Sequence, residues 1–514
     1  MMDISPYIGE PVTGKDGQYQ LIVIDKEMRR PRVIDFNDIE DYFDIKEVGS
    51  SHQSFIFQHH KDWKYPSELH LYERLADDEG RVPFRPSDED FTIRTTSVCD
   101  RILNYLSNYV RLPGQFDAVI VMAFIISTYF MELFEYAPRL LIRGATNSGK
   151  STLLNILSEL CYRGNLSGDT TEASLFRLID SCHITPLLDE FQDYDTSAQN
   201  GIKKILKNGN VRGHCVQRAE KVGNGPSIPR SYDVFSPVAF VNQAGNKSLP
   251  EEVINRSMSL TMISRGDVLL PMKPDREELK AIRNELYSIR WSWLADPKLV
   301  GFERIYDEAL GELQDPDGVA TPFGNIHYSS RCRDILGTMY TVGKMTGMEE
   351  PILRYFDNMQ KVAEDEDRNN DLGVVFAAIM GVLENNDYCE LFIGNITDLL
   401  ETVTTFDVAR QYERILGDEG ELQNNIRIPT RTVTNMLKDM GFQFVRDRNT
   451  NRSLFSHSDL EVVFQMNLFK YGTDEQRERY GDKLITKRSN KADDAVKEQC
   501  QIDRQPNNLT GEGE

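Results

Sequence analysis

The residues that bear most directly on chemistry stand at 144–151, where GATNSGKS matches the pattern G-x-x-x-x-G-K-[ST]. A glycine at each end lets the backbone bend so that successive N–H groups face a bound anion. Lys150 is then expected to reach the β- and γ-phosphates, and the Ser151 hydroxyl to bind Mg²⁺. The sequence therefore predicts a site for ATP and Mg²⁺, lined by Gly144, Ala145, Thr146, Asn147, Ser148, Gly149, Lys150, Ser151 and Thr152.

A strand and a helix must hold this loop. The apolar run RLLIR at 139–143 predicts the strand, and TLLNILSEL at 152–160 predicts an amphipathic helix. The amino end of that helix adds about half a positive charge where the phosphates would lie. The flanks therefore match the context that a phosphate-binding loop requires.

Hydrolysis needs a further acid near the metal, and ITPLLDEF at 184–191 supplies two at the end of an apolar run. We expect Asp189 to organise Mg²⁺ through its water shell, and Glu190 to orient and polarise the attacking water. An adjacent Asp–Glu pair favours a P-loop ATPase with a catalytic glutamate. It weighs against GTPase switches and small-molecule kinases.

Two more segments complete the predicted catalytic set. The strand-like run SPVAFVN ends in Asn242, whose amide would hold the γ-phosphate or the attacking water, unless it is simply a turn residue. In EEVINRSMSLTMI, Arg256 stands just before another strand-like run. In ring ATPases an arginine there reaches the neighbouring subunit's nucleotide and stabilises transition-state charge, and a structural surface arginine is the alternative.

Apolar and amphipathic runs alternate from 138 to 265, which predicts an α/β fold with a parallel sheet flanked by helices. The strongly apolar run at 118–131 covers about 14 residues, fewer than the roughly 20 that span a bilayer. We predict that it is a buried helix, so no membrane partner is expected.

In this order, GATNSGKST, LLDEF, VAFVN and INRSMSL resemble an AAA+ module. With its asparagine, GATNSGK resembles the phosphate-loop motif of superfamily 3 helicases. The wider pattern resembles helicase-like ATPases of phages, plasmids and archaeal or bacterial mobile elements. The resemblance covers roughly residues 100 to 350. It implies that Lys150 binds phosphate, Ser151 and Asp189 hold Mg²⁺ and Glu190 is the base. It further implies sensor 1 at Asn242, an arginine finger at Arg256, and sensor 2 at Arg331, with Arg333 as a competitor.

Residues 201–225 form a basic segment in an acidic chain. Six cations and one acid, Glu220, give this segment +5, whereas the whole chain carries −22. In rings of the resembled class, a β-hairpin here projects into the pore and grips one DNA strand by its phosphates. A basic solvated helix and loop is the alternative. The predicted DNA contacts are Arg212, Arg218 and Lys221.

Residues 404–471 show the order of a winged helix-turn-helix: helix, short strand, helix and a two-stranded wing around NTN. Six cations against two acids give 426–456 a charge of +4. Such a helix enters the major groove of DNA, although winged helices also dock proteins. The predicted DNA contacts are Arg431, Arg446, Arg448 and Arg452.

Length and composition frame this organisation. The 514 residues are enough for three to four domains at about 150 residues each. The negative charge confines nucleic-acid contacts to local patches, and seven cysteines without a C-x-x-C pair favour a reducing cytoplasm. We predict an N-terminal α+β region of unknown role (1–94), the ATPase core with its preceding helices (95–266), a helical lid and connector (267–403), the winged helix (404–471) and a disordered charged tail (472–514).

The leading hypothesis is an ATP-hydrolysing ring motor, a homo-hexamer that unwinds or translocates DNA for a mobile or viral-like replicon, with primase or other replication proteins as partners. The pore would take single-stranded DNA, and the winged helix duplex DNA. One alternative is an AAA+ initiator, loader or defence switch that binds DNA without processive unwinding. Another is a DNA-binding regulator whose ATPase gates its oligomerisation.

Overall fold

The computed structural model divides the chain into two compact units, residues 1–358 and 359–514. Each unit is considered by itself. The structure describes residues 7–13, 19–25, 31–34, 88–168, 170–189, 196–221, 227–243, 251–263, 271, 273–295, 301–321, 324–385, 400, 403–418, 429–446, 453–455 and 460–481.

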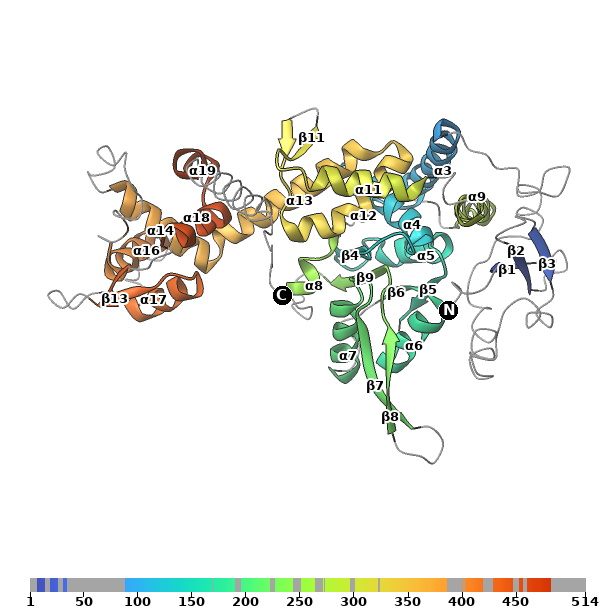
Figure 1. Cartoon of the computed structure of the whole chain (residues 1–514), viewed down its shortest axis with the longest axis horizontal. Helices are drawn as coiled ribbons and strands as arrows, with labels where there is room; N and C mark the ends of the chain where they lie inside the picture. Colours follow the sequence, from blue (N-terminus) through green and yellow to red (C-terminus); the bar gives the residue numbers. More distant parts are fainter. Residues whose placement is uncertain are drawn as a thin grey trace, which may run out of the picture. The chain divides into compact units, whose positions relative to one another are not determined.

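A five-stranded parallel sheet lies at the centre of the first unit (Figure 1). Its strand order is β10-β4-β9-β6-β5, so β9 lies between the strand that enters the phosphate loop and the strand that ends at Asp189. Every residue of β6 is buried, as expected for a parallel strand covered on both faces. The α/β prediction is confirmed. The strands are β4 (Arg139–Gly144), β5 (Gly164–Ser167), β6 (Thr185–Leu188), β9 (Val238–Gln243) and β10 (Met258–Met262).

Helices flank this sheet. In α5, Leu153, Leu154, Leu157 and Leu160 are buried at a spacing near 3.6 residues, which turns one face to the core. The apolar run near 118–131 forms α4 and a 3-10 turn, η4, both buried as predicted. The helices are α3 (Asp88–Tyr109), α4 (Asp117–Ser127), η4 (Thr128–Phe130), α5 (Lys150–Leu160), α6 (Glu172–Cys182), α7 (Thr196–Asn208), α8 (Glu251–Ile254), α9 (Arg276–Ala295), α11 (Phe302–Leu313) and α12 (Ser330–Thr346).

Smaller sheets complete the first unit. The N-terminal region holds three antiparallel strands in the order β1-β2-β3, and two hairpins follow later in the chain. Within the described residues, no helix is long and apolar enough to cross a membrane. These strands are β1 (Tyr7–Thr13), β2 (Tyr19–Asp25), β3 (Pro31–Ile34), β7 (Cys215–Lys221), β8 (Ser227–Asp233), β11 (Val319–Thr321) and β12 (Gly324–Ile326).

The second unit has its own apolar core, built by α14, α16, α17, α18 and the strand β14. We predicted residues 371–385 as part of the lid, but α14 packs here against α16. The elements are α13 (Glu349–Asn369, which begins in the first unit), α14 (Asp371–Asn385), α16 (Thr405–Asp418), α17 (Thr430–Asp439), β13 (Phe444–Arg446), β14 (Ser453–Phe455), α18 (Leu460–Tyr471) and α19 (Asp474–Gly481).

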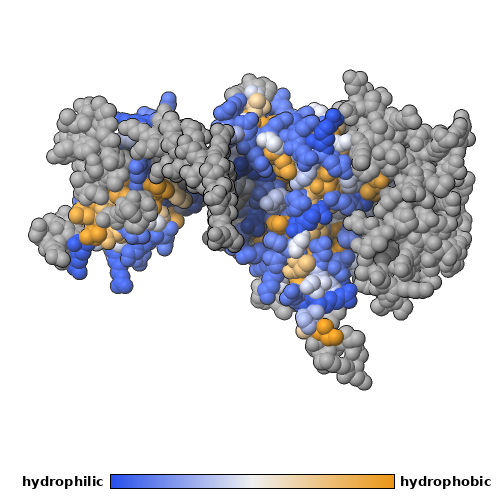
Figure 2. All heavy atoms as spheres, viewed as in Figure 1, coloured by the Kyte–Doolittle hydropathy of each residue, from blue (hydrophilic) through white to orange (hydrophobic). Residues whose placement is uncertain are grey.

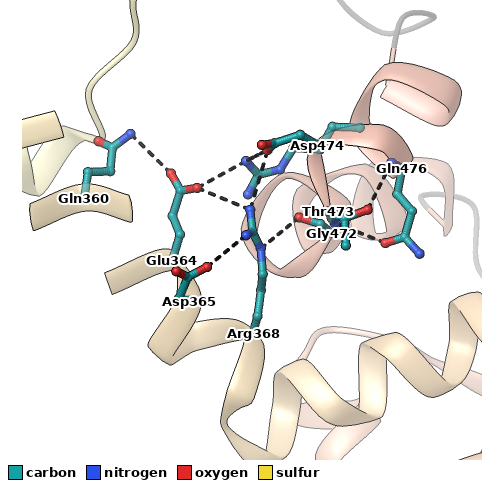
Figure 3. A network of polar contacts seen from close by, with 9 residues as sticks. Gln360, Glu364, Asp365, Arg368, Gly472, Thr473, Asp474 and Gln476 are labelled. Atoms are coloured by element: carbon teal, nitrogen blue, oxygen red, sulfur yellow. Dashed lines mark hydrogen bonds and ion pairs between the residues drawn. The ribbon is translucent and has the colours of Figure 1, made fainter. Parts of the chain in front are cut away.

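The tail that we predicted to be disordered begins with a helix, α19 (Figure 3). Thr473 and Gln476 cap it reciprocally: the Thr473 N–H donates to Gln476 Oε1 at 3.1 Å, and the Gln476 N–H donates to Thr473 Oγ1 at 3.2 Å. Arg368 of α13 donates to the Gly472 carbonyl at 3.2 Å and lies 3.6 Å from Asp474. The helix therefore forms because its amino end is capped and held, although its sequence lacks apolar periodicity.

Candidate nucleotide site and nucleic-acid hairpin

The loop between β4 and α5 has the backbone that its glycines predict. A Cβ added to Gly144 would lie 2.5 Å from the Met262 carbonyl oxygen, so only glycine fits between β4 and β10. Gly149 has a φ of 92°, in the left-handed region, and opens α5. Asn147 also has a positive φ, 63°, which asparagine tolerates better than most residues. The amino end of α5 therefore faces the loop as a phosphate site requires.

Gly144→Ala tests this packing. The new methyl group would collide with the Met262 carbonyl, so we expect ATP affinity to fall at least about tenfold and the melting temperature to drop by several degrees. Titration with a fluorescent ATP analogue and a thermal melt measure the two effects. Gly168→Ala is the matched control, because no atom lies within 4 Å of its added Cβ. Equal ATP affinity in the two variants would contradict this account of the loop.

The Lys150 ammonium lies over the loop itself. It donates to the carbonyl oxygens of Gly144 at 3.0 Å and Ala145 at 2.6 Å. Both acceptors belong to the segment that would surround the β- and γ-phosphates. Phosphate oxygens would therefore compete with two backbone carbonyls for this cation, without a large movement of the side chain.

Ser151 and Asp189, 38 positions apart in the chain, meet at the mouth of the loop. The Ser151 hydroxyl donates to Asp189 Oδ2 at 3.2 Å. Asp189 directly follows β6, and its N–H donates to the Ser167 carbonyl at 3.1 Å, which fixes it beside the end of β5. A hydroxyl and a carboxylate are the hard oxygen ligands that Mg²⁺ prefers. The two predicted metal ligands are thus brought together.

These two oxygens would supply only part of a Mg²⁺ shell. Among the described residues, no group of three or more His, Cys, Asp or Glu side chains could hold a metal ion. Mg²⁺ usually keeps several waters and takes further oxygens from the substrate phosphates. The site therefore fits an ion that arrives with a nucleotide. Glu190, the predicted base, lies outside the described residues.

Asn242 stands where it can reach both halves of the site. It is 3% exposed and lies near the carboxyl end of β9, level with Arg143 of β4. Because β9 separates β4 from β6, Asn242 lies between the strand of the phosphate loop and the strand of Asp189. This location suits a side chain that contacts the γ-phosphate or the attacking water.

Arg256 lies at the amino end of the strands, whereas the phosphate loop lies at their carboxyl end. Met258 pairs with Leu140, and Met262 pairs with Gly144, so Arg256 precedes the amino end of β10. At about 3.3 Å for each residue, the loop lies more than about 13 Å further along the strands. Arg256 therefore lies far from the phosphate loop of its own chain.

A buried arginine, Arg139, interacts with Arg256. Arg139 is 1% exposed, and its guanidinium makes no hydrogen bond within the described part of the chain. Burial first, and then the charge of Arg256, lower the Arg139 pKa to about 9. The nearby carboxyl of Asp334 has a raised pKa, because burial outweighs the influence of Tyr136, Arg256 and other groups. Two arginines, Arg139 and Arg256, thus influence each other at the amino end of the sheet.

The start of α12 lies near the same amino end of the sheet. Asp334, in the first turns of α12, interacts with Tyr136 and Arg256. The backbone of Arg331 thus lies near the amino end of the sheet and not at the phosphate loop of its own chain. Its side chain lies outside the described residues. Arg333, the competing candidate, donates to the Ser330 hydroxyl at 3.3 Å.

The basic segment supplies the first strand of a hairpin. Strands β7 and β8 pair antiparallel and project from the first unit (Figure 1). The space-filling view shows both hydrophilic and apolar residues along this projection (Figure 2). A hairpin is present, as predicted, but its second strand lies beyond residue 225 and residues 201–208 belong to the helix α7. Its contact with DNA stays a prediction.

The predicted DNA contacts in this segment differ in their surroundings. Arg212 donates to the carbonyls of Met131 and Phe134 and stacks on the Phe235 ring at 4.7 Å, so it also ties the hairpin base to the core. Arg218 pairs with Glu172. The side chain of Lys221 lies outside the described residues.

Arg230 was not among the predicted DNA contacts, although it lies directly opposite Arg218 in the register of the two strands. Residue 230 lies beyond the segment 201–225, so the charge of that segment did not include it. The turn-forming run GNGP at 223–226 was the available signal, because a hairpin closing there brings 218 and 230 together. The basic site on the hairpin is thus built from both strands.

In the second unit, α16, α17 and the β13–β14 hairpin follow one another along the chain, whereas the short strand predicted at 426–428 lies outside the described residues. The winged helix itself stays a prediction. Arg431 on α17 and Arg446 on β13 are exposed. Val433 and Leu437 turn the other face of α17 into the core. Arg448 and Arg452 lie outside the described residues.

No family model and no curated protein matches the chain. Among solved structures, the C-terminal region of NrS-1 in its apo A form is 11% identical and covers 87% of this chain and 96% of that one, with a TM-score of 0.30. SCCmec type IV Cch, an active helicase, is 14% identical over 89% and 94%, with a TM-score of 0.33. A full-length MCM homolog from Methanopyrus kandleri is 13% identical over 54% and 62%, with a TM-score of 0.31. At such TM-scores these similarities carry no argument, so the functional assignment rests on the site residues.

Proposed function

We propose that this protein is an ATP-hydrolysing motor that acts on DNA as a ring of identical subunits, a hexamer serving the replication of a mobile or viral-like replicon. The observation that carries the proposal is the Ser151–Asp189 hydrogen bond at the mouth of a glycine loop. It brings together the two residues proposed to hold Mg²⁺, close to a lysine that lies over the loop.

In the proposed reaction, the loop and the amino end of α5 hold the triphosphate, and Lys150 neutralises its β- and γ-oxygens. Ser151 and Asp189 would hold Mg²⁺, which offsets charge developing on the phosphates. Asn242 orients the γ-phosphate or the water. Glu190, following Asp189 directly, accepts the proton of that water.

The separation of Arg256 and the phosphate loop within one chain supports the ring. If Arg256 stabilises the transferring phosphate, it must do so at the nucleotide of a second copy. The second arginine beside it, Arg139, supports this role, because a pair of cations favours the approach of an anion. Arg331 would likewise meet the neighbour's nucleotide. Repetition of such a heterologous contact gives a ring when the rotation between successive copies closes.

DNA enters the proposal through two basic surfaces. The β7–β8 hairpin would follow the phosphates of a single strand in the pore, a sequence-independent contact that suits a motor. The second unit would bind duplex DNA as a winged helix, with α17 in the major groove and Arg446 on the backbone. Exposed Arg431 supports this orientation, because the opposite face of α17 is buried.

The rate of ATP hydrolysis with and without single-stranded DNA tests the proposal. We expect a motor to hydrolyse ATP at least several times faster with the strand bound, because translocation couples the two events. A DNA-independent rate would contradict the motor and favour the initiator, loader or switch alternative. An absence of Mg²⁺-dependent ATP hydrolysis would overturn the nucleotide site itself.

A further inference from the structure

One face of α6 contacts the half of the hairpin that lies away from its turn. Glu172, Phe176 and Asp180 recur every four residues and therefore lie on one side of the helix. Glu172 pairs with Arg218, Phe176 packs on Tyr232 with ring centroids 4.5 Å apart, and Asp180 Oδ1 accepts from the Asp233 N–H at 2.8 Å. Because α6 leads into β6 and Asp189, it directly connects the hairpin with the nucleotide site.

Glu172 occupies a niche made by a glycine. Gly201 lies inside α7, where glycine costs about 1 kcal/mol relative to alanine. A Cβ at Gly201 would lie 2.3 Å from Glu172 Oε2 and 2.4 Å from its Cδ. The helix thus leaves space for this carboxylate, which ends against Arg218 with side-chain exposures of 27% for the acid and 34% for the base. The pair is more enclosed than an ordinary surface ion pair.

Arg218 and Arg230 present an unusual charge arrangement. They are direct cross-strand partners in β7 and β8, so both side chains start on the same face of the hairpin. Like charges directly opposite each other destabilise a hairpin. Each guanidinium also lies over an aromatic ring, Arg218 over Phe176 at 5.6 Å and Arg230 over Tyr232 at 5.0 Å. Two cations held in this way are suited to an anion that can bridge them.

We propose that Arg218 and Arg230 form a binding site for a phosphodiester of single-stranded nucleic acid, and that Glu172 occupies this site as an internal anion until the strand displaces it. This inference rests on the proposed action on DNA. We call the displaceable Glu172–Arg218 ion pair the latch. A phosphate would replace the carboxylate as partner of Arg218 and, unlike it, also meet Arg230. Release of Glu172 would loosen the grip of α6 on the hairpin at the moment of DNA binding.

Binding of a labelled single-stranded oligonucleotide to the full chain tests the latch. We expect Glu172→Gln to bind about fivefold more tightly than wild type, because the competing charge is gone. Glu277→Gln is the matched control: it removes the same charge from the first turn of α9 and should leave the affinity unchanged. Arg218→Gln and Arg230→Gln should each weaken binding severalfold and lower the salt slope by about one, whereas Arg304→Gln on α11 should not.

Two further variants make the test specific. In the Arg218→Gln background, Glu172→Gln should no longer raise the affinity, because the cation it competes for is absent. Gly201→Ala should also tighten binding, since its methyl group displaces the Glu172 carboxylate while improving the helix propensity of α7. Thermal melts identify variants that fail to fold, and Gly201→Ala leaves both charged residues in place.

The outcomes separate the latch from the proposed function. Tighter binding by Glu172→Gln and Gly201→Ala, abolished without Arg218, supports the latch. Weaker or unchanged binding by both folded variants overturns it, even if wild type binds the strand well. A wild type that binds no single-stranded nucleic acid at any salt concentration overturns the proposed DNA function together with the latch.

Discussion

Lys150→Ala is expected to lower ATP hydrolysis by at least about a thousandfold. Its ammonium lies on the carbonyls of Gly144 and Ala145, at the mouth where the β- and γ-phosphates would lie. Alanine would leave the triphosphate charge to the backbone N–H groups and Mg²⁺ alone. Steady-state phosphate release and titration with a fluorescent ATP analogue measure the losses of turnover and of affinity.

Lys280→Ala, at an exposed position of α9, is the control for removing one lysine charge. It should hydrolyse ATP at the wild-type rate. Wild-type turnover in purified, folded Lys150→Ala would mean that another group holds the phosphates, and the nucleotide site would have to be placed elsewhere.

Arg256→Ala is expected to lower hydrolysis by about a thousandfold or more, and to do so in the neighbouring subunit's site. Arg256 lies at the amino end of the sheet, more than about 13 Å from the loop of its own chain at the rise of a β-strand. Its loss should leave ATP binding nearly intact. Arg304→Ala, an exposed arginine of α11, is the control.

A mixture of two inactive variants gives this prediction its sharpest form. Lys150→Ala keeps Arg256, and Arg256→Ala keeps Lys150. In randomly mixed rings with equal amounts of each, about a quarter of the interfaces pair an intact loop with an intact arginine. We therefore expect the mixture to regain up to about a quarter of wild-type activity. A mixture that assembles but stays as inactive as its parents would place both residues in one subunit's site.

The phosphate loop could be predicted from sequence because its requirements are local. Gly144, Gly149, Lys150 and Ser151 fall within eight consecutive residues, and each serves the geometry of one backbone turn. Asp189 could be predicted as well, since an acid after a buried strand has a defined place at the sheet edge. In the structure its carboxylate accepts a hydrogen bond from the Ser151 hydroxyl at 3.2 Å, and its role at a metal stays a prediction. The insertion of β9 between β4 and β6 could not, because strand order depends on packing across the whole unit.

The remaining features depend on contacts distant in sequence. Nothing near Arg218 in the sequence indicates that Glu172 pairs with it, and Gly201 looks like a weak point of a helix until that carboxylate is placed. Arg212 shows the same limitation in another way. In the sequence it is one more cation of a basic segment, whereas in the fold it caps carbonyls of Met131 and Phe134. Charge counts find a basic segment but not the partners of its residues.

Strand displacement tests the central claim most directly. A labelled oligonucleotide annealed to a longer single strand is incubated with the full chain, Mg²⁺ and either ATP or a non-hydrolysable analogue. The account predicts release of the labelled strand with ATP, and no release with the analogue or with Lys150→Ala. Hydrolysis of ATP on this substrate without any release would contradict a motor that moves along DNA.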